Sequence, residues 1–136
     1  MNSNQDLLFQ VAKAVQTGQA DIHWAMGKAV RTELKDTLRS QFAQLEAIRR
    51  DVLEIASARG WDIGAERAAR RWDFKFYNQD RDARIAEKLI NSNTKGMIRS
   101  LKALHRYPGN DQRLCILSQR LLDCQRANII KLQGFV

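Results

Sequence analysis

The chain has 136 residues, with 23 lysines and arginines against 15 acidic residues, a formal net charge of +8, one proline and two cysteines. A chain of this length forms one domain with its own core, and no apolar run approaches the roughly 18 residues that cross a bilayer. Residues 1–15 also lack the basic stretch and apolar core of a secretory signal. We therefore expect one soluble, cytoplasmic domain over residues 1–136, with no membrane span.

The first half of the chain is predicted to form two helices. A single proline in 136 residues leaves long stretches rich in Ala, Leu, Gln, Arg and Lys without a helix breaker. Apolar residues at helical spacing indicate a first helix over about residues 5–30. A second apolar stripe is rotated by about 120° from the first, so the chain turns between them. A second helix is predicted over 32–59, with Thr32 as its N-cap and Gly60 as its stop.

The second half repeats this plan after a connecting segment. Residues 60–81 are predicted as a crossover that contains a short helix at 65–77. A third helix is predicted over 82–106 and a fourth over 112–134. The only proline marks the turn between them, and Asp111 has the side chain and position of an N-cap for the fourth helix.

Four amphipathic helices of similar length predict an all-α four-helix bundle. The first two helices, and the last two, are joined by short turns and are expected to form antiparallel hairpins. The crossover is long enough to travel the length of the bundle, about 40 Å, as a short helix with extended flanks. We therefore expect a ferritin-like helix order with a long crossover, rather than a simple up-down-up-down bundle.

Several short motifs in the last two predicted helices match a known family. These are Ile85-Ala86-Glu87-Lys88-Leu89-Ile90, Ser92-x-x-x-Gly96, Leu121-Leu122, Asn128-Ile129 and Phe135. In these residues the chain resembles the small ferritin-like proteins of spore-forming Firmicutes, which include spore-coat-F-like proteins and uncharacterised relatives. The resemblance implies a ferritin-like four-helix bundle. It implies no settled activity.

A ferritin-like di-iron site can be tested directly on the residues. Such a site takes a Glu from each of two helices and a Glu-x-x-His pair from each of the other two. The only histidines are His23 and His105, and neither has a glutamate three residues before it. The expected bundle-centre positions carry Gln19, Glu46, Arg49, Asn93, Gln125 and Asn128. Carboxamides and an arginine do not neutralise two iron ions, so no catalytic residue, metal or cofactor is predicted.

These six residues are predicted to form a buried polar layer at the degenerate metal-site positions. Buried carboxamides need partners, so we expect the four carboxamides to bond one another and the two charged residues to pair at the edge. The favoured interpretation is a satisfied polar layer in a structural bundle. The alternative is a small polar pocket, a remnant of a metal site.

Six cations on the third helix share the face opposite its apolar stripe. This set, the basic ridge, consists of Arg84, Lys88, Lys95, Arg99, Lys102 and Arg106. Its spacing of 4, 7, 4, 3 and 4 residues keeps the cations within about 60° of arc over about 33 Å. Like charges at this spacing destabilise a helix, so one interpretation of the ridge is an anionic partner: nucleic acid, an anionic surface or an acidic protein. The alternative is a solvated face whose cations pair with acidic residues elsewhere on the chain.

A second basic cluster lies in the crossover beside aromatic residues. It consists of Arg67, Arg70, Arg71 and Trp72. Arginines interleaved with aromatic rings suit single-stranded nucleic acid. The favoured interpretation is that the aromatic rings pin the crossover onto the bundle, because a crossover helix needs an apolar face.

The leading functional hypothesis is a non-enzymatic interaction or structural protein, such as a coat or assembly protein. Self-association through the fourth helix is expected from Ile116, Ile130 and Val136, which point away from its apolar stripe. The alternative is binding of nucleic acid or another anionic surface through the basic ridge. A metal-dependent redox enzyme with a degenerate site comes last. The expected location is cytoplasmic, or spore-associated if the family resemblance extends to location.

Overall fold

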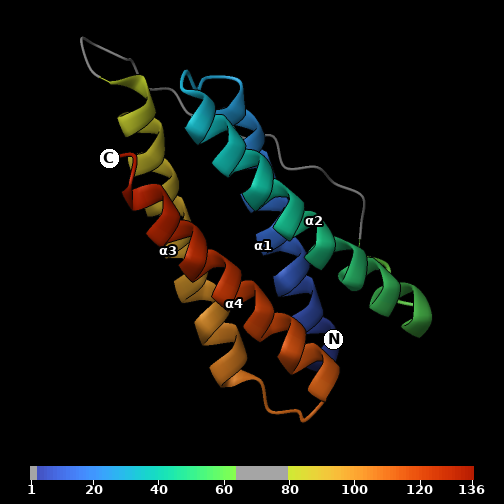
Figure 1. The fold of residues 1–136 in the computed structure, drawn as a ribbon. Helices are drawn as coiled ribbons and strands as arrows, with labels where there is room; N and C mark the ends of the chain where they lie inside the picture. Colours follow the sequence, from blue (N-terminus) through green and yellow to red (C-terminus); the bar gives the residue numbers. More distant parts are fainter. Residues whose placement is uncertain (1–2, 64–79) are drawn as a thin grey trace.

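The computed structural model describes residues 3–63 and 80–136, and its regular structure in these ranges is entirely α-helical (Figure 1). Helix bounds are α1 Ser3–Met26, α2 Thr32–Arg59, α3 Arg81–Arg106 and α4 Gln112–Gln133. The prediction of an all-α bundle of four helices is confirmed. None of the helices in these ranges has the length and apolarity to cross a bilayer.

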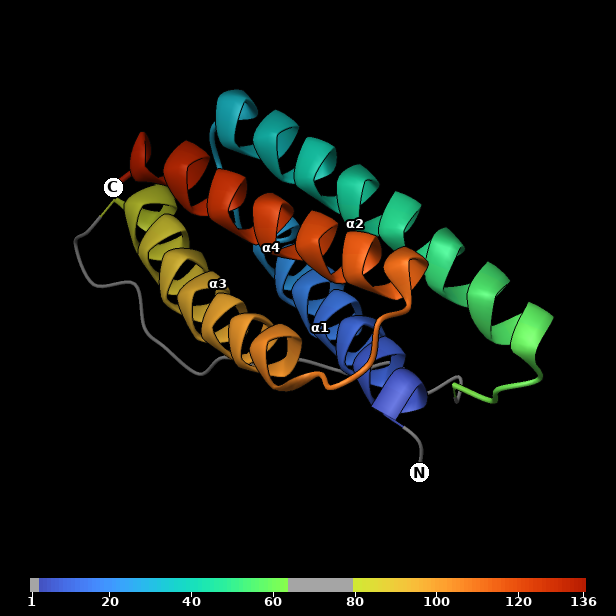
Figure 2. The same cartoon turned by 90° about the horizontal axis from the view of Figure 1, so that it is seen from below.

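The four helices pack side by side around one core. Helix α1 packs against α2, and α3 against α4, while α1 also contacts α3 and α2 contacts α4. Helices α1 and α4 meet across the centre of the bundle, and the view in Figure 2 shows α2 and α4 running next to each other. Helices α1, α2 and α4 each bury a stripe of apolar residues along their length, and α3 adds Ile85, Ala86 and Leu89 from its N-terminal part to the same core.

Contacts at the two ends of the bundle fix the direction of each helix. At one end, Asp82 at the start of α3 bonds the turn between α1 and α2. At the other end, Arg59 in the last turn of α2 pairs with Asp111 at the start of α4, at 2.7 Å. Helices α2 and α3 therefore run in the same direction, and the order is up, down, down, up. The end of α2 and the start of α3 therefore lie at opposite ends of the bundle (Figure 1).

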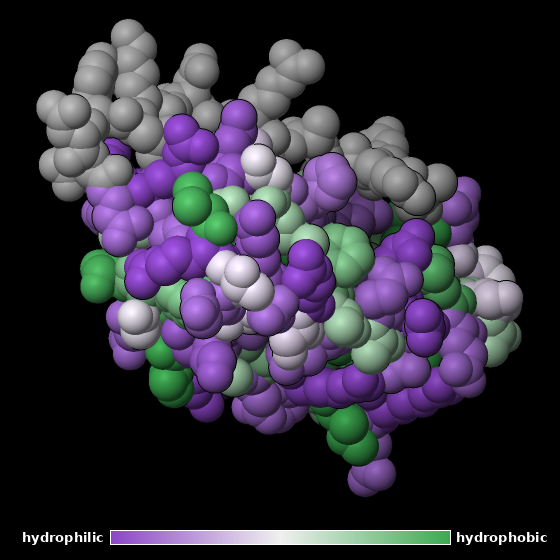
Figure 3. All heavy atoms as spheres, turned by 45° about the horizontal axis from the view of Figure 1, so that its top comes forward, coloured by the Kyte–Doolittle hydropathy of each residue, from purple (hydrophilic) through white to green (hydrophobic). Residues whose placement is uncertain are grey.

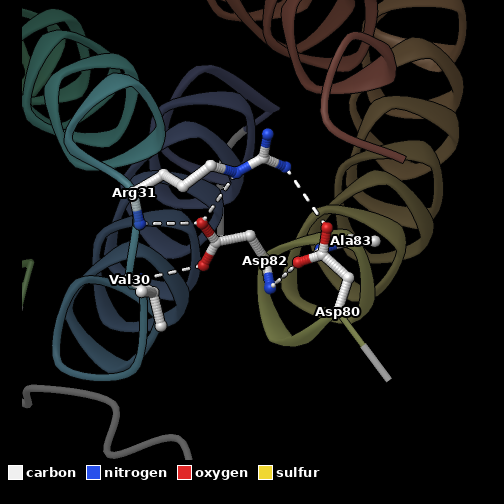
Figure 4. Close-up of polar contacts among 5 residues, drawn as sticks. All are labelled: Val30, Arg31, Asp80, Asp82 and Ala83. Atoms are coloured by element: carbon white, nitrogen blue, oxygen red, sulfur yellow. Dashed lines mark hydrogen bonds and ion pairs between the residues drawn. The ribbon is translucent and has the colours of Figure 1, made fainter. Parts of the chain in front are cut away.

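Asp82 holds α3 against the α1–α2 turn (Figure 4). The carboxylate is buried, with 1% of the residue exposed. It accepts hydrogen bonds from the backbone N–H groups of Val30 and Arg31, both at 2.8 Å, and from Arg31 Nε at 3.3 Å. Helix α3 itself is capped by Asp80, which accepts from the N–H groups of Asp82 and Ala83. One buried carboxylate thus links three helices.

The same contact explains two differences from the predicted helix ends. Helix α1 ends at Met26, four residues before the predicted limit, and Arg31 rather than Thr32 occupies the N-cap position of α2 without a side-chain capping bond. The prediction of Thr32 as the cap is wrong because Asp82 accepts the N–H groups at this turn from across the bundle. Two other predicted ends are confirmed: Gly60 ends α2 in the left-handed conformation at φ 69°, and Asp111 caps α4.

The predicted crossover helix at 65–77 lies outside the described residues. The same holds for the crossover cluster, Arg67, Arg70, Arg71 and Trp72.

Candidate functional site

The centre of the bundle contains three buried carboxamides, which come from α2 and α4. Gln125 and Asn128 of α4 are both buried. The third is Gln41 of α2, which the sequence analysis left out of the polar layer. The sequence signal for its burial is its position midway along the apolar stripe of α2. Glu46 and Arg49 on this helix are partly exposed, so they lie at the edge of the polar layer, where the ion pair was predicted.

Glu46 and its neighbours form a polar chain at the edge of the bundle. Gln19 of α1 donates to Glu46 Oε2 at 2.8 Å, and Arg49 donates to Glu46 Oε1 at 3.3 Å. The hydrogen bond from Gln19 is the largest effect on the pKa of Glu46 and lowers it. Partial burial raises the pKa, but the hydrogen bond from Gln19 together with the charge and hydrogen bond of Arg49 outweighs this effect. The predicted ion pair at the edge is present within α2, and the hydrogen bond from Gln19 links it to α1.

The four carboxamides were predicted to bond one another, and among the described residues they do not. Asn93 is half-buried and donates to the backbone carbonyl of Leu89, one turn earlier in α3. Asn128 contacts the sulfur of Cys124 at 3.8 Å. Side-chain direction explains the difference, because residues on one arc of each helix still point to different neighbours. Among the residues that the structure describes, these contacts replace the expected network.

Two glycines close the centre of the bundle. A Cβ atom added at Gly96 of α3 would lie 3.1 Å from Gln125 Nε2, and one added at Gly18 of α1 would lie 3.0 Å from a methyl carbon of Leu45. Glycine inside a helix costs about 1 kcal/mol relative to alanine, and here it allows neighbouring side chains to approach the backbone. At these two points a neighbouring side chain packs directly against the helix backbone.

An open groove lies on the described surface between α2 and α4. It has a volume of about 510 Å³ and is lined by Ala43, Ala47 and Ile48, with Ser40, Gln44, Arg120 and Cys124 as its polar members. Burial raises the pKa of the Cys124 thiol, which keeps the thiol protonated and makes it a poor nucleophile. The groove shows no arrangement of groups for nucleophilic chemistry.

The described residues hold no cluster of metal ligands. Across residues 3–63 and 80–136, no three His, Cys, Asp or Glu side chains lie close enough to hold one metal ion together. His23 and His105 are both exposed. The polar residues at the bundle centre are carboxamides and hydroxyls, which suit hydrogen bonding.

Several buried polar atoms lack a hydrogen-bond partner among the described residues. They are Gln10 Oε1, Gln41 Nε2, Ser118 Oγ and Gln125 Oε1. An unpaired buried hydroxyl or amide costs about 1–3 kcal/mol. Ser118 of α4 is completely buried, so its hydroxyl is the simplest of these atoms to test.

Replacing Ser118 with alanine is expected to raise the free energy of unfolding by about 1 kcal/mol. The change removes an unpaired buried hydroxyl and introduces the residue with the highest helix propensity. Urea denaturation followed by circular dichroism measures the effect. Ser57→Ala, at an exposed position in α2, is the matched control for helix propensity alone. Equal gains in both variants would contradict a cost from the buried hydroxyl.

The basic ridge lies on the outer face of α3, and all six of its cations are exposed. The opposite face is fixed against α1 by two polar contacts. Ser92 donates to Asp21 at 2.5 Å, and Gln10 donates to Ser100 Oγ at 3.1 Å. These bonds, together with the buried apolar stripe, set the rotation of α3 and turn the ridge away from the core.

The C-terminal part of the ridge carries four cations without ionic partners. We call this set the distal ridge: Lys95, Arg99, Lys102 and Arg106. No ion pair joins any of them to a residue in the described ranges. On α4, by contrast, Arg113 pairs with Glu54 and Arg120 pairs with Asp51.

The helix dipole accounts for only one member of the distal ridge. A cation in the last turn of a helix is stabilised by the partial negative charge there, and the effect falls off within that turn. Arg106 is the last residue of α3. Lys95, Arg99 and Lys102 precede that turn, so their alignment has no explanation in the stability of the helix.

Exposed apolar side chains on α4 do not form one continuous patch. Ile116 is 67% exposed and Ile130 is 63% exposed, but they are 14 residues apart, about 21 Å along the helix. The charged residues Asp123 and Arg126 lie between them on the exposed side. On the face drawn in Figure 3, hydrophobic residues likewise lie singly or in small groups among hydrophilic ones.

Comparison with known proteins identifies the fold and no family. No family model and no curated protein matches the sequence. The structure is similar to the crystal structure of a conserved hypothetical protein from Mycobacterium tuberculosis, with a TM-score of 0.75 and 13% sequence identity. The match covers 98% of this chain and 97% of that chain. At this identity the similarity extends to the fold alone.

Proposed function

We propose that the chain is a non-enzymatic four-helix bundle, ferritin-like in its helix order and without a metal site, that acts as an interaction protein and binds an anionic partner through the basic ridge. The observation that carries this proposal is the distal ridge, where four exposed cations in line have no ionic partner among the described residues. An anionic partner supplies the missing counter-charge.

The charge of the whole chain supports the same proposal. The net charge of +8 attracts polyanions over roughly a Debye length, about 8 Å at physiological ionic strength. Cations elsewhere on the described surface are partly neutralised by the cross-helix pairs of α4 with α2. The attraction is therefore strongest along α3.

A coat or assembly role is the second candidate, because it follows from the family resemblance and from exposed Ile116, Ile130 and Val136. Its physical support is weaker, since the first two are separated by polar residues and a stable protein interface needs a continuous apolar centre. A degenerate redox enzyme comes third. Among the described residues, no three His, Cys, Asp or Glu side chains lie close enough together to hold a metal ion for it.

Retention on immobilised heparin tests the proposal. We expect the protein to remain bound at about 0.15 M salt, and a fourfold variant of the distal ridge, Lys95→Gln, Arg99→Gln, Lys102→Gln and Arg106→Gln, to elute without retention. The matched control removes four exposed cations from α4: Arg113→Gln, Arg120→Gln, Arg126→Gln and Lys131→Gln. Circular dichroism confirms that both variants are folded.

The control separates the ridge from net charge, because both variants lose four positive charges. Retention of the α4 variant with loss of the ridge variant supports the proposal. Equal weakening of both variants would show that binding follows net charge alone, and no retention of the unmodified chain would overturn the proposal.

A further inference from the structure

On the premise of this function, we infer that the anionic partner is double-stranded nucleic acid, which α3 contacts along its phosphate backbone. All six cations of the ridge lie on one helix, α3 (Figure 1). Its six cations span about 33 Å, close to the length of one turn of a DNA duplex, about 34 Å. A rod of this length matches a linear polyanion.

The charge density of a duplex fits the spacing of the distal ridge. The four cations of the distal ridge extend over about 16 Å of helix. Over that distance a duplex carries about ten phosphates, one for every 1.7 Å or so of its axis. Each of the four long, exposed side chains therefore has a phosphate within reach without any deformation of the helix.

Single-stranded nucleic acid fits this face less well. Proteins hold single strands by stacking bases on aromatic side chains next to a basic groove. The exposed residues beside the distal ridge in the described part of α3 are Ile98, Leu101 and His105. None of them is Phe, Tyr or Trp. This face therefore has cations that phosphates can contact, and it has no aromatic ring on which a base can stack.

A lipid surface also fits less well, because the apolar face of α3 is already used. Helices that bind membranes bury a broad apolar face at the headgroup boundary. In α3 that face, with Ile85, Ala86 and Leu89, lies in the bundle core. The outer face has only Ile98, 45% exposed, and Leu101, 37% exposed, as large apolar side chains. A vesicle would be held by charge alone.

Fluorescence anisotropy with a labelled duplex of about 20 base pairs, two helical turns, tests this inference on the full chain over a series of salt concentrations. Each neutralised phosphate contributes about −0.9 to the slope of log K against log salt. We expect a slope of about −3.6 for the four cations of the distal ridge. Arg99→Gln with Lys102→Gln is expected to reduce the slope to about −1.8.

The control is Arg113→Gln with Arg120→Gln, which removes the same charge from α4. It is expected to leave the slope within about 0.5 of the unmodified value, because these cations lie away from the ridge and are paired. Equal slope changes in the two variants would overturn the inference, since binding would then follow net charge.

The other outcomes are also decisive. Retention on heparin without duplex binding would overturn the duplex as partner and leave the proposed function standing, whereas loss of both would overturn both. Tighter binding to the matching single strand, or to vesicles of phosphatidylcholine and phosphatidylserine, would replace the duplex by that partner. The inference is supported if the duplex binds more tightly than the single strand and the vesicles, and if only the ridge variant changes the slope.

Discussion

Replacing Asp82 with asparagine is expected to lower the free energy of unfolding by about 3 kcal/mol. Breaking a buried charged contact by removing one partner costs about 3–5 kcal/mol, because the remaining groups lose their counterpart while they stay buried. Here the buried partner is the Asp82 carboxylate, which the N–H donors of Val30 and Arg31 and the guanidinium of Arg31 would lose. The side chain of Arg31 is 51% exposed, so the expected cost lies at the lower end of this range. An amide in place of the carboxylate offers one acceptor oxygen and turns an NH₂ group toward these donors.

Urea denaturation followed by circular dichroism measures this loss. Asp36→Asn is the control, because Asp36 has an exposed carboxylate that pairs with Arg39 one turn away in α2. Exposed pairs contribute about 0–1 kcal/mol, so this variant is expected to stay within about 0.5 kcal/mol of the unmodified chain. Similar losses in the two variants would contradict a special contribution from Asp82.

The pH dependence of the unfolding free energy, measured for the unmodified chain and for Asp82→Asn, gives a second readout. Burial by itself raises the pKa of Asp82, but the hydrogen bonds from Val30 and Arg31 and the charge of Arg31 outweigh it, so the pKa is lowered in the folded state. Between the two pKa values the unfolded state therefore binds more protons than the folded state. The contribution of Asp82 to the unfolding free energy is fully present above the unfolded pKa, and it is lost as the pH falls through the folded pKa. The stability difference between the unmodified chain and Asp82→Asn should shrink as the pH falls below about 4. A difference that stays constant would contradict this assignment.

Replacing Leu121 with alanine is expected to cost about 3 kcal/mol of unfolding free energy. Leu121 lies midway along α4 and is completely buried. Large-to-small substitutions of this kind lose the transfer energy of the methyl groups and leave a cavity, with typical costs of 2–5 kcal/mol. Denaturation in urea, with the slope of the transition held as a check on two-state behaviour, measures the effect.

Ile116→Ala on the same helix is the matched control. Ile116 is 67% exposed, so its loss is expected to change the unfolding free energy by less than about 0.5 kcal/mol. The pair tests which face of α4 is inward. A cost at Ile116 comparable to that at Leu121, growing with protein concentration, would indicate that Ile116 is buried in an assembly and would revive self-association through α4.

Helix number and most helix ends were predictable because their causes are local. Apolar residues at a period of 3.6 mark a helix and its inward face, and the four apolar stripes of the sequence follow this period. Gly60 and Asp111 end and begin helices through bonds with residues at most four positions away. Information of this kind is contained in a short window of sequence.

The polar contacts between helices were not predictable in the same way. Asp82 caps the turn before α2 from about 50 residues away in sequence, and no local pattern announces such a bond. Periodicity assigned Gln19, Asn93 and Gln125 to inward arcs, but the partner of each depends on the relative shift and rotation of neighbouring helices. Periodicity also places Gln41 on the inward arc of α2, although the prediction assigned the polar layer on this helix to Glu46 and Arg49.

The order of helices also bears on how the molecule assembles. Residues 3–63 contain a complete antiparallel pair, and residues 80–136 contain another, so most contacts within each half are local and form quickly. Joining the halves closes a much longer loop, at an entropic cost that rises with its length. Because the first pair leaves the ribosome before α3 is made, we expect two hairpins that form in succession and then dock, with the burial of Asp82 as the step that makes them one domain.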